Sequence, residues 1–133
     1  MQYLLDTNIC IFLIRKKSAH VLKELRQHDP ADLCISTVTV AELEYGCDRS
    51  ANPADNRLAL AEFLSPFTIL PFDEAAARVY GTVRTELERA GTPIGAMDLM
   101  IAAHALSKQL TVVTNNTREF NRVNGLTVTD WHR

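Results

Sequence analysis

The stretch Leu33-Cys34-Ile35-Ser36-Thr37-Val38-Thr39-Val40-Ala41-Glu42-Leu43 joins a short apolar run directly to a helical pattern. Its first three residues are typical of a buried strand, which is expected to end at Ser36 and Thr37. The run Tyr3-Leu4-Leu5 ends in the same way, at Asp6. Further short runs rich in β-branched residues lie at 68–70 and 111–113, and a weaker one lies at 126–128. The sequence therefore predicts four to five short strands.

Helical patterns lie between these predicted strands. The clearest covers residues 73–89, where Asp73 is the expected N-cap and Gly91 and Pro93 follow the end of the helix. The other predicted helices cover residues 18–28, 37–49, 54–63 and 97–108, and one more begins near Asn8. Strands that alternate with helices indicate an α/β fold. We therefore predict one domain, residues 1–133, with a central parallel sheet of four to five strands flanked by helices.

The composition is that of an ordinary globular protein. Of the 133 residues, 47% are hydrophobic and 23% are charged, which excludes a disordered chain and fits a single domain. The N-terminus lacks the features of a signal peptide, and the longest early apolar run, residues 9–14, is too short to span a membrane. We expect a soluble cytoplasmic protein. Cys10, Cys34 and Cys47 are expected to be buried free thiols, because their spacing fits neither a disulfide framework nor a zinc site.

Carboxylates stand in apolar surroundings in the first half of the chain. Asp6 directly follows the first strand, at the sheet edge where open α/β folds bind ligands, although a role as N-cap of the next helix is equally well supported. Glu42 and Glu44 share a helix that starts after the second strand. Periodicity does not decide which of the two glutamates points to the sheet edge and which faces solvent.

Two more acids lie in the second half. Asp98 is the one carboxylate within residues 94–105, a pattern that is apolar nearly all round and therefore predicts a buried central helix. Alternatively, the helix dipole alone explains a first-turn acid there, with a stabilisation of about 0.3–1 kcal/mol. Glu119 follows the strand at 111–113 in a polar stretch, which on its own is typical of an ordinary turn.

Four acids from distant segments are thus expected at one edge of one sheet. Apart from Arg118, which precedes Glu119, no Lys or Arg stands beside them in the sequence, so they would repel one another, and a divalent cation between them would relieve that repulsion. A site of oxygen ligands alone favours Mg²⁺, with Mn²⁺ as a substitute, over zinc. Such a site activates water and orients phosphate groups, so phosphodiester hydrolysis is the expected reaction.

The net charge of −2 argues at first against a nucleic-acid partner. However, setting the four site acids aside from the 16 acids of the chain leaves 12 acids against 14 bases. The candidate contacts to an RNA backbone are Arg15, Lys16, Lys17, Lys23, Arg26, Arg118 and Arg122. Taken one by one, these charges are explained equally well by solubility.

Four motifs, in order along the chain, resemble those of the VapC toxins of the PIN-domain family. They are Tyr3-Leu4-Leu5-Asp6-Thr7-Asn8, Val40-Ala41-Glu42-Leu43-Glu44-Tyr45-Gly46, Pro93-Ile94-Gly95-Ala96-Met97-Asp98 and Thr114-Asn115-Asn116-Thr117-Arg118-Glu119-Phe120. The resemblance runs over essentially the whole chain and is greatest to the enteric VapC proteins. Each motif alone is a weak signal, but four of them in this order and spacing form a specific one.

The resemblance implies which residues form the site. It assigns the acidic site to Asp6, Glu42, Asp98 and Glu119, and so selects Glu42 over Glu44. The expected polar support comes from Thr7, Asn8, Thr114 and Asn116. Many members of the family carry aspartate where this chain has Glu119, so the longer side chain is expected to bind a metal through water.

The resemblance also implies a function. The family consists of Mg²⁺-dependent endoribonucleases that act as toxins of type II toxin–antitoxin systems. Its members form homodimers and are inhibited by a VapB-type antitoxin, whose C-terminal segment covers the active site within a higher toxin–antitoxin assembly. Enteric VapC proteins act on tRNA in the anticodon loop, so the expected substrate is initiator tRNA and the expected effect is inhibition of translation.

Three other functions fit parts of the sequence. An aspartyl-phosphate phosphatase would use Asp6 as its nucleophile, but the second aspartate expected two positions later is Asn8 in this chain. A non-catalytic RNA-binding module would have lost catalytic residues from its site, whereas all four carboxylates are present in this chain. A metal-free ribonuclease would need a pair of histidines, and the four histidines show no suitable spacing: His20, His28, His104 and His132.

Overall fold

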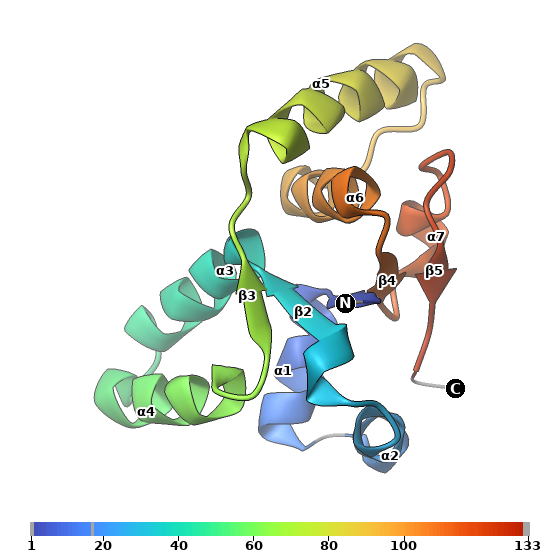
Figure 1. The fold of residues 1–133 in the computed structure, drawn as a ribbon. Helices are drawn as coiled ribbons and strands as arrows, with labels where there is room; N and C mark the ends of the chain where they lie inside the picture. The colour runs from blue at the N-terminus through green and yellow to red at the C-terminus, as the bar shows by residue number, and fades with distance from the viewer. Residues whose placement is uncertain (1, 17, 132–133) are drawn as a thin grey trace.

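The centre of the molecule is a five-stranded parallel sheet (Figure 1). The computed structural model describes residues 2–16 and 18–131, and orders the strands β3-β2-β1-β4-β5. All four neighbouring pairs are parallel. The strands are β1 (Tyr3–Leu5), β2 (Leu33–Ser36), β3 (Thr68–Leu70), β4 (Thr111–Val113) and β5 (Val128–Thr129). The predicted α/β architecture with a parallel sheet is confirmed.

The strand order places a switch point beside β1. Within the sheet, β2 and β3 lie on one side of β1, and β4 and β5, which come later in the chain, lie on its other side. β1 pairs with β4 in the register Leu4↔Val112 and Leu5↔Val113. In open α/β sheets, ligands bind outside the carboxyl ends of the strands at such a reversal. Asp6, the residue that follows β1, lies at this position.

Helices cover both faces of the sheet. Figure 1 shows α5 and α6 on one side of the sheet, and α1, α2 and α4 on the other side. The helices are α1 (Thr7–Arg15), α2 (Ala19–Arg26), α3 (Thr37–Asp48), α4 (Pro53–Leu64), α5 (Glu74–Arg89), α6 (Ala96–Lys108) and the short α7 (Thr117–Phe120). A single 3₁₀ turn, Pro30–Asp32, precedes β2.

The alternation of side chains along the strands divides the core in two. Leu4, Cys34 and Val112 point to a cluster shared with α5 and α6. Their neighbours Leu5 and Val113, with residues of α1 and α4, belong to a cluster on the opposite face. Since successive strand residues point to opposite faces, a strand buried on both sides must be apolar throughout. This explains why the first, second and fourth strands appear as continuous apolar runs.

The ends of several elements differ from the prediction. The fifth strand was predicted at residues 126–128, but it begins at Val128, because the Leu126 amide still closes a turn onto the Val123 carbonyl (3.4 Å). The second helix ends at Arg26, two residues earlier than predicted. Asp73 is the N-cap of α5, as predicted, and accepts a hydrogen bond from the Ala76 amide (3.0 Å).

The cysteines are buried free thiols, as predicted. Burial raises the pKa of Cys10 well above its usual value, and the nearby carboxylate of Asp6 adds to the effect. A thiol with a raised pKa is a poor nucleophile and a poor metal ligand. In the described part of the chain, no helix is both long enough and apolar enough to cross a membrane.

Candidate active site

Asp6 is the most buried acid of the candidate site, with 1% of its surface exposed. It is also the N-cap of α1, since its Oδ1 accepts the Ile9 amide at 2.9 Å, so the N-cap role is confirmed. The pKa of Asp6 is raised to about 7, chiefly by burial and to a smaller extent by the charges of Asp98 and Glu42. Hydrogen bonds from Thr114 and the Ile9 amide oppose this rise. Asp6 is therefore both the N-cap of α1 and a member of the acidic cluster.

Asp98 lies in the first turn of α6, where Gly95 leaves the helix without a side-chain cap. Its pKa is raised to about 6, first by burial and then by its contact with Glu119. The Asn116 side-chain amide donates to Asp98 Oδ2 (3.1 Å) and to Glu119 Oε2 (2.7 Å). One amide thus holds two carboxylates together and relieves part of their repulsion. Asp98 itself is half-buried, although α6 is the central buried helix that the sequence predicted.

Glu42 and Glu44 have different surroundings. The Glu42 Oε1 accepts a hydrogen bond from the Thr7 hydroxyl at 2.7 Å, and Thr39 Oγ1 lies 3.2 Å from the same hydroxyl oxygen. Glu44 turns to α4, where its carboxylate lies 3.8 Å from Arg57 Nε. The structure therefore brings Glu42 into the cluster and leaves Glu44 outside it. Thr39 was not expected here; its only signal was a polar residue on the buried side of α3, one turn before Glu42.

All four carboxylates interact electrostatically. Asp6 is raised in pKa by Asp98 and Glu42, and Asp98 is raised by Glu119 and Glu42. The main causes of both pKa shifts are burial, hydrogen bonds and the charges of the other carboxylates. Among residues 2–16 and 18–131, no three side chains of Asp, Glu, His or Cys are close enough together to hold a metal ion as they stand. The described arrangement is a set of mutually repelling oxygen donors, each engaged by a protein hydrogen bond.

The polar support has three members in direct contact with the acids. Thr7 binds Glu42, and Thr114, which is fully buried, binds Asp6. Thr114 Oγ1 also accepts the Asn116 amide at 2.9 Å, which orients the side chain that bridges Asp98 and Glu119. Asn8 is exposed and lines the neighbouring cavity instead.

A cavity of about 700 Å³ adjoins the acids. It lies between α1, α3, α4 and the first turn of α6, and both Glu42 and Asp98 line it. Its walls are apolar, formed by residues such as Ile11 and Leu43, and its rim includes Arg15. A cleft with apolar walls and a few convergent polar groups is typical of a ligand site.

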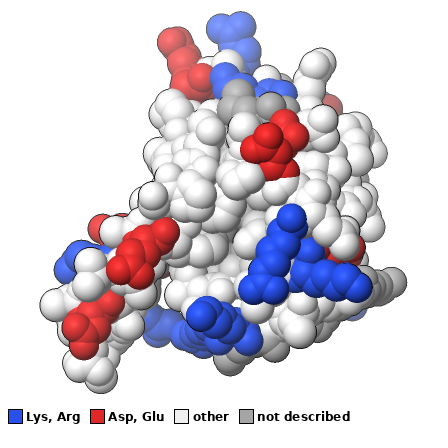
Figure 2. Space-filling model, turned by 60° about the horizontal axis from the view of Figure 1, so that its bottom comes forward, with Lys and Arg blue, Asp and Glu red and all other residues white. Residues whose placement is uncertain are grey.

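The basic residues have several roles. Figure 2 shows several Lys and Arg side chains in the lower half of the face that it presents, and others at its top beside Asp and Glu. Lys23 and Arg26 are exposed in the last turn of α2, and Arg15 ends α1 at the cavity rim. Arg122 donates to the Pro93 carbonyl at 2.7 Å and so braces the loop before α6. Lys16 is exposed after α1 and Arg118 is exposed on α7, whereas Lys17 lies outside the described residues.

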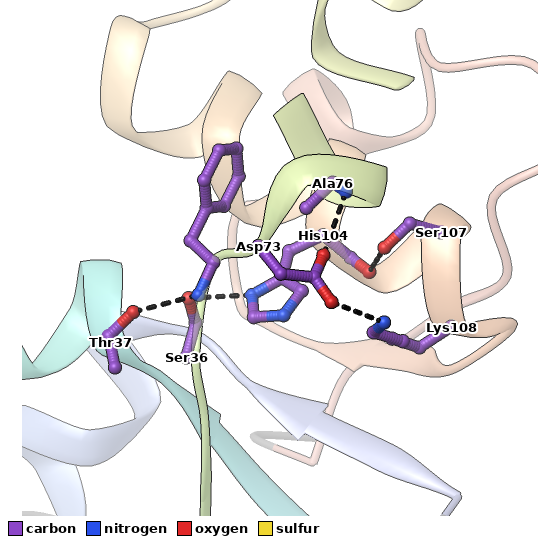
Figure 3. Close-up of polar contacts among 8 residues, drawn as sticks. Ser36, Thr37, Asp73, Ala76, His104, Ser107 and Lys108 are labelled. Carbon is purple, nitrogen blue, oxygen red and sulfur yellow. Dashed lines mark hydrogen bonds and ion pairs between the residues drawn. The ribbon is translucent and has the colours of Figure 1, made fainter. Parts of the chain in front are cut away.

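The histidines lie away from the acids. His104 on α6 is fully buried and points to Ser36, whose Oγ lies 2.8 Å from its Nδ1, with Asp73 and Lys108 beside it (Figure 3). Ser36 in turn accepts the Val38 amide and caps α3, the helix that carries Glu42. Burial lowers the pKa of His104, so the ring is neutral at neutral pH.

The other histidines are equally unsuited to acid–base catalysis. His28 stacks on Trp131, with ring centroids 4.9 Å apart and planes 7° apart. It lies two residues beyond the end of α2, in contrast to the predicted helix over residues 18–28. His20 is exposed on α2, and His132 lies outside the described residues. In the described part of the chain, the structure thus gives no support to a catalytic pair of histidines.

Comparison with known proteins relates this geometry to one family. The family model for the PIN domain matches residues 3–126. The tRNA(fMet)-specific endonuclease VapC of Shigella flexneri is 47% identical over 131 residues, which cover 98% of each chain. The protein of the same name from Salmonella typhimurium is 44% identical over the same share of both chains. The DNA-bound VapBC structure from Salmonella typhimurium contains a similar chain, with a TM-score of 0.94, 43% identity and 98% of each chain covered.

Proposed function

Because this chain belongs to the VapC ribonucleases of the PIN-domain family, we propose that it is the toxin of a type II toxin–antitoxin pair, which cleaves initiator tRNA in the anticodon loop and so stops translation. The observation that carries the proposal is the buried Asp6 at the switch point of the sheet, within reach of the charges of Asp98 and Glu42. The two relatives named for action on tRNA(fMet) support the choice of substrate. Because the chain belongs to this family, we no longer favour the hypothesis of an aspartyl-phosphate phosphatase.

Ribonucleases of the PIN family generally use divalent metal ions, and we propose Mg²⁺, with Mn²⁺ as a substitute, for this chain. The donor set fits such an ion, because the four acids offer only hard oxygen ligands and repel one another without a cation. Mg²⁺ keeps several waters and binds one or two carboxylates directly, so it needs no cluster of three protein ligands. Asp6 and Asp98 would be the direct ligands, and Glu42 and Glu119 would act through water.

The proposed roles of the other residues follow from their contacts. When bound, the metal supplies activation of water and orientation of the scissile phosphate. Thr7 fixes the Glu42 carboxylate, and Thr114 fixes Asp6. The side-chain amide of Asn116 donates to both Asp98 and Glu119, and so fixes the positions of the two carboxylates relative to each other. Groups held in this way need little reorganisation when substrate arrives.

A protein partner is part of the proposal. The solved relative from Salmonella typhimurium is a VapBC complex, which supports a VapB-type antitoxin as the partner of this chain. We propose that the C-terminal segment of the antitoxin covers the acidic site, and that the toxin forms a homodimer within a higher assembly. Arg15, Lys16, Lys23 and Arg26 are the proposed contacts for the RNA backbone.

The substrate proposal is tested with purified protein, Mg²⁺ and two RNAs, initiator tRNA and the elongator methionine tRNA. We expect cleavage in the anticodon loop of the initiator, at least about tenfold faster than of the elongator. Mapping of the RNA ends should find a 5′-phosphate and a 3′-hydroxyl, as expected when water and not the ribose 2′-hydroxyl attacks. A 2′,3′-cyclic phosphate would overturn the mechanism, equal rates would overturn the specificity, and absence of any nuclease activity would favour a binding module.

Thr7→Val should lower kcat/KM for this cleavage about tenfold, because it removes the hydroxyl that holds Glu42 while keeping the shape of the side chain. Thr7→Ser, which keeps the hydroxyl, should retain most of the activity. Thr85→Val is the matched control, since the Thr85 hydroxyl donates to the Gly81 carbonyl on the exposed side of α5. A wild-type rate for Thr7→Val would show that the hydroxyl does not position Glu42.

A further inference from the structure

Tyr45 is a large exposed side chain beside the acidic site. With 67% of its surface exposed, it has the highest value among the large hydrophobic residues of the described chain. It lies on α3 one turn after Glu42, and residues three apart on a helix are neighbours on one face. Both Tyr45 and Glu42 line the cavity of about 700 Å³. Leu58 on α4 is almost as exposed, at 64%, but does not line it.

Arg49 adds a cation to the tyrosine ring. Its guanidinium carbon lies 5.6 Å from the centroid of Tyr45, in the range of a cation–π contact. Arg49 forms no salt bridge within the described part of the chain, because the nearby acids Glu44 and Asp48 are both taken by Arg57. The positive charge of Arg49 is therefore free to meet a phosphate of a ligand at the cavity.

The chemistry of the cavity fits an unpaired nucleotide. Apolar walls and an exposed aromatic ring suit the face of a base, whereas the rim carries the amides of Asn8 and Asn56 and the guanidinium of Arg15. Bases that are splayed out of single-stranded loops are bound by aromatic stacking together with hydrogen bonds to their edges. One helical turn rises about 5.4 Å, which places such a base next to a phosphate at the acids.

We propose that Tyr45 is the stacking platform for one unpaired base of the RNA substrate, adjacent to the cleaved bond, and that Arg49 contacts the neighbouring phosphate. This inference rests on the ribonuclease function proposed above and deepens it, because it assigns substrate positioning to residues outside the acidic cluster. Arg49 occupies one face of the ring, so the base takes the other face. The requirement for a splayed base accounts for a preference for loops over duplex RNA.

Steady-state kinetics with the anticodon stem-loop test the role of Tyr45. Tyr45→Ala should raise KM roughly 5- to 150-fold, the range for losing one stacked base, and leave kcat within about twofold. Tyr45→Phe and Tyr45→Trp should restore KM, because each keeps an aromatic face. Leu58→Ala is the control for loss of an exposed apolar side chain and should leave both constants unchanged. Arg49→Gln should reduce the salt dependence of RNA affinity by about one phosphate contact.

Stem-loops that lack a single base distinguish stacking from a structural effect. Binding is measured in the Asp98→Asn background, where the RNA stays intact. At one loop position, removal of the base should weaken binding to the Tyr45-containing protein as much as Tyr45→Ala does, and should cost the Tyr45→Ala protein nothing more. Additive losses at every position would overturn the proposal. So would an unchanged KM for Tyr45→Ala together with weakened antitoxin binding, which would assign the cavity to the protein partner.

The failure of this inference is separable from that of the proposed function. If the wild-type protein cleaves the tRNA and the Tyr45→Ala variant has the same KM, the role proposed for Tyr45 is wrong, but the proposed ribonuclease function is unaffected. A wild-type protein that neither binds nor cleaves the stem-loop overturns both.

Discussion

Asp6→Asn is expected to abolish RNA cleavage and, in the absence of metal, to stabilise the folded protein at neutral pH. Cleavage should fall on the order of a thousandfold or more, because the substitution removes a charge that the proposed metal site requires. Asn keeps the shape of the side chain and is as good an N-cap as Asp, so α1 should retain its first turn. The two effects therefore have opposite signs, and no purely structural residue would show both.

The stability gain depends on pH in a defined window. Burial raises the pKa of Asp6 from 3.8 to about 7, so the folded state binds a proton that the unfolded state has already released between pH 4 and 7. Wild-type stability therefore falls as pH rises through this window, and the ionised carboxylate costs on the order of 4 kcal/mol above pH 7. His104, whose pKa is lowered by burial, gives the opposite trend in both proteins. The difference between Asp6→Asn and wild type removes the contribution of His104 and leaves that of Asp6 with its interactions with Asp98 and Glu42.

Asp73→Asn is the matched control for this experiment. Asp73 is also an aspartate at a helix N-cap, but its hydrogen bond with Lys108 lowers its pKa, so its contribution to stability is present above pH 4 and lost as pH falls. Urea unfolding in EDTA at pH 5, 6, 7 and 8 should show Asp73→Asn slightly less stable than wild type throughout. An Asp6→Asn protein that is less stable than wild type at pH 7 to 8 would contradict the raised pKa.

Chelation of divalent cations is expected to abolish cleavage, and Mg²⁺ or Mn²⁺ should restore it. The same ions should raise the melting temperature of wild type, because a ligand that binds only the folded state stabilises it by mass action. At a free concentration 100 times Kd, the gain is about 2.7 kcal/mol, or roughly 10 °C for a chain of this size. Asp98→Asn should lose most of this increase and most of the activity.

Melting curves with and without Mg²⁺ separate two roles for Asp98. Without metal, Asp98→Asn should be as stable as wild type or more so, since its raised pKa of about 6 reflects burial and repulsion by Glu119 and Glu42. A variant that unfolds much earlier in EDTA would mean that Asp98 serves chiefly to stabilise the start of α6. Full cleavage by wild type in EDTA would contradict the metal mechanism.

The sequence predicted the architecture well because the central strands are buried on both faces. Their residues 4–5, 33–35 and 112–113 are buried and apolar without interruption, and such runs are easily recognised. Two short elements near the C-terminus gave weaker signals. β5 pairs on one side only and has two residues, and α7 has four, too few for periodicity to appear.

The four acids of the candidate site could be predicted from the sequence, but their burial and their contacts with other side chains could not. Asp98 was expected on the buried central helix, yet Asp6 is the more buried of the two, because a residue at the end of a central strand is covered by helices from both halves of the chain. His104 and Ser36 are 68 positions apart in the sequence, so no local sequence pattern predicts the contact between them. The choice between Glu42 and Glu44 likewise depended on Arg57, a residue on the next helix.

The pairing of β1 with β4 bears on the synthesis of the protein. Leu5 and Val113 are neighbours in the sheet, although 107 residues lie between them, and β4 alone separates β1 from β5. A ribosome that adds about 5–20 residues each second has almost completed the chain before this pairing is possible. The acids span positions 6 to 119, so a nascent or truncated chain holds no assembled site. RNA cleavage by a chain built in this way is therefore expected only when its synthesis is nearly finished.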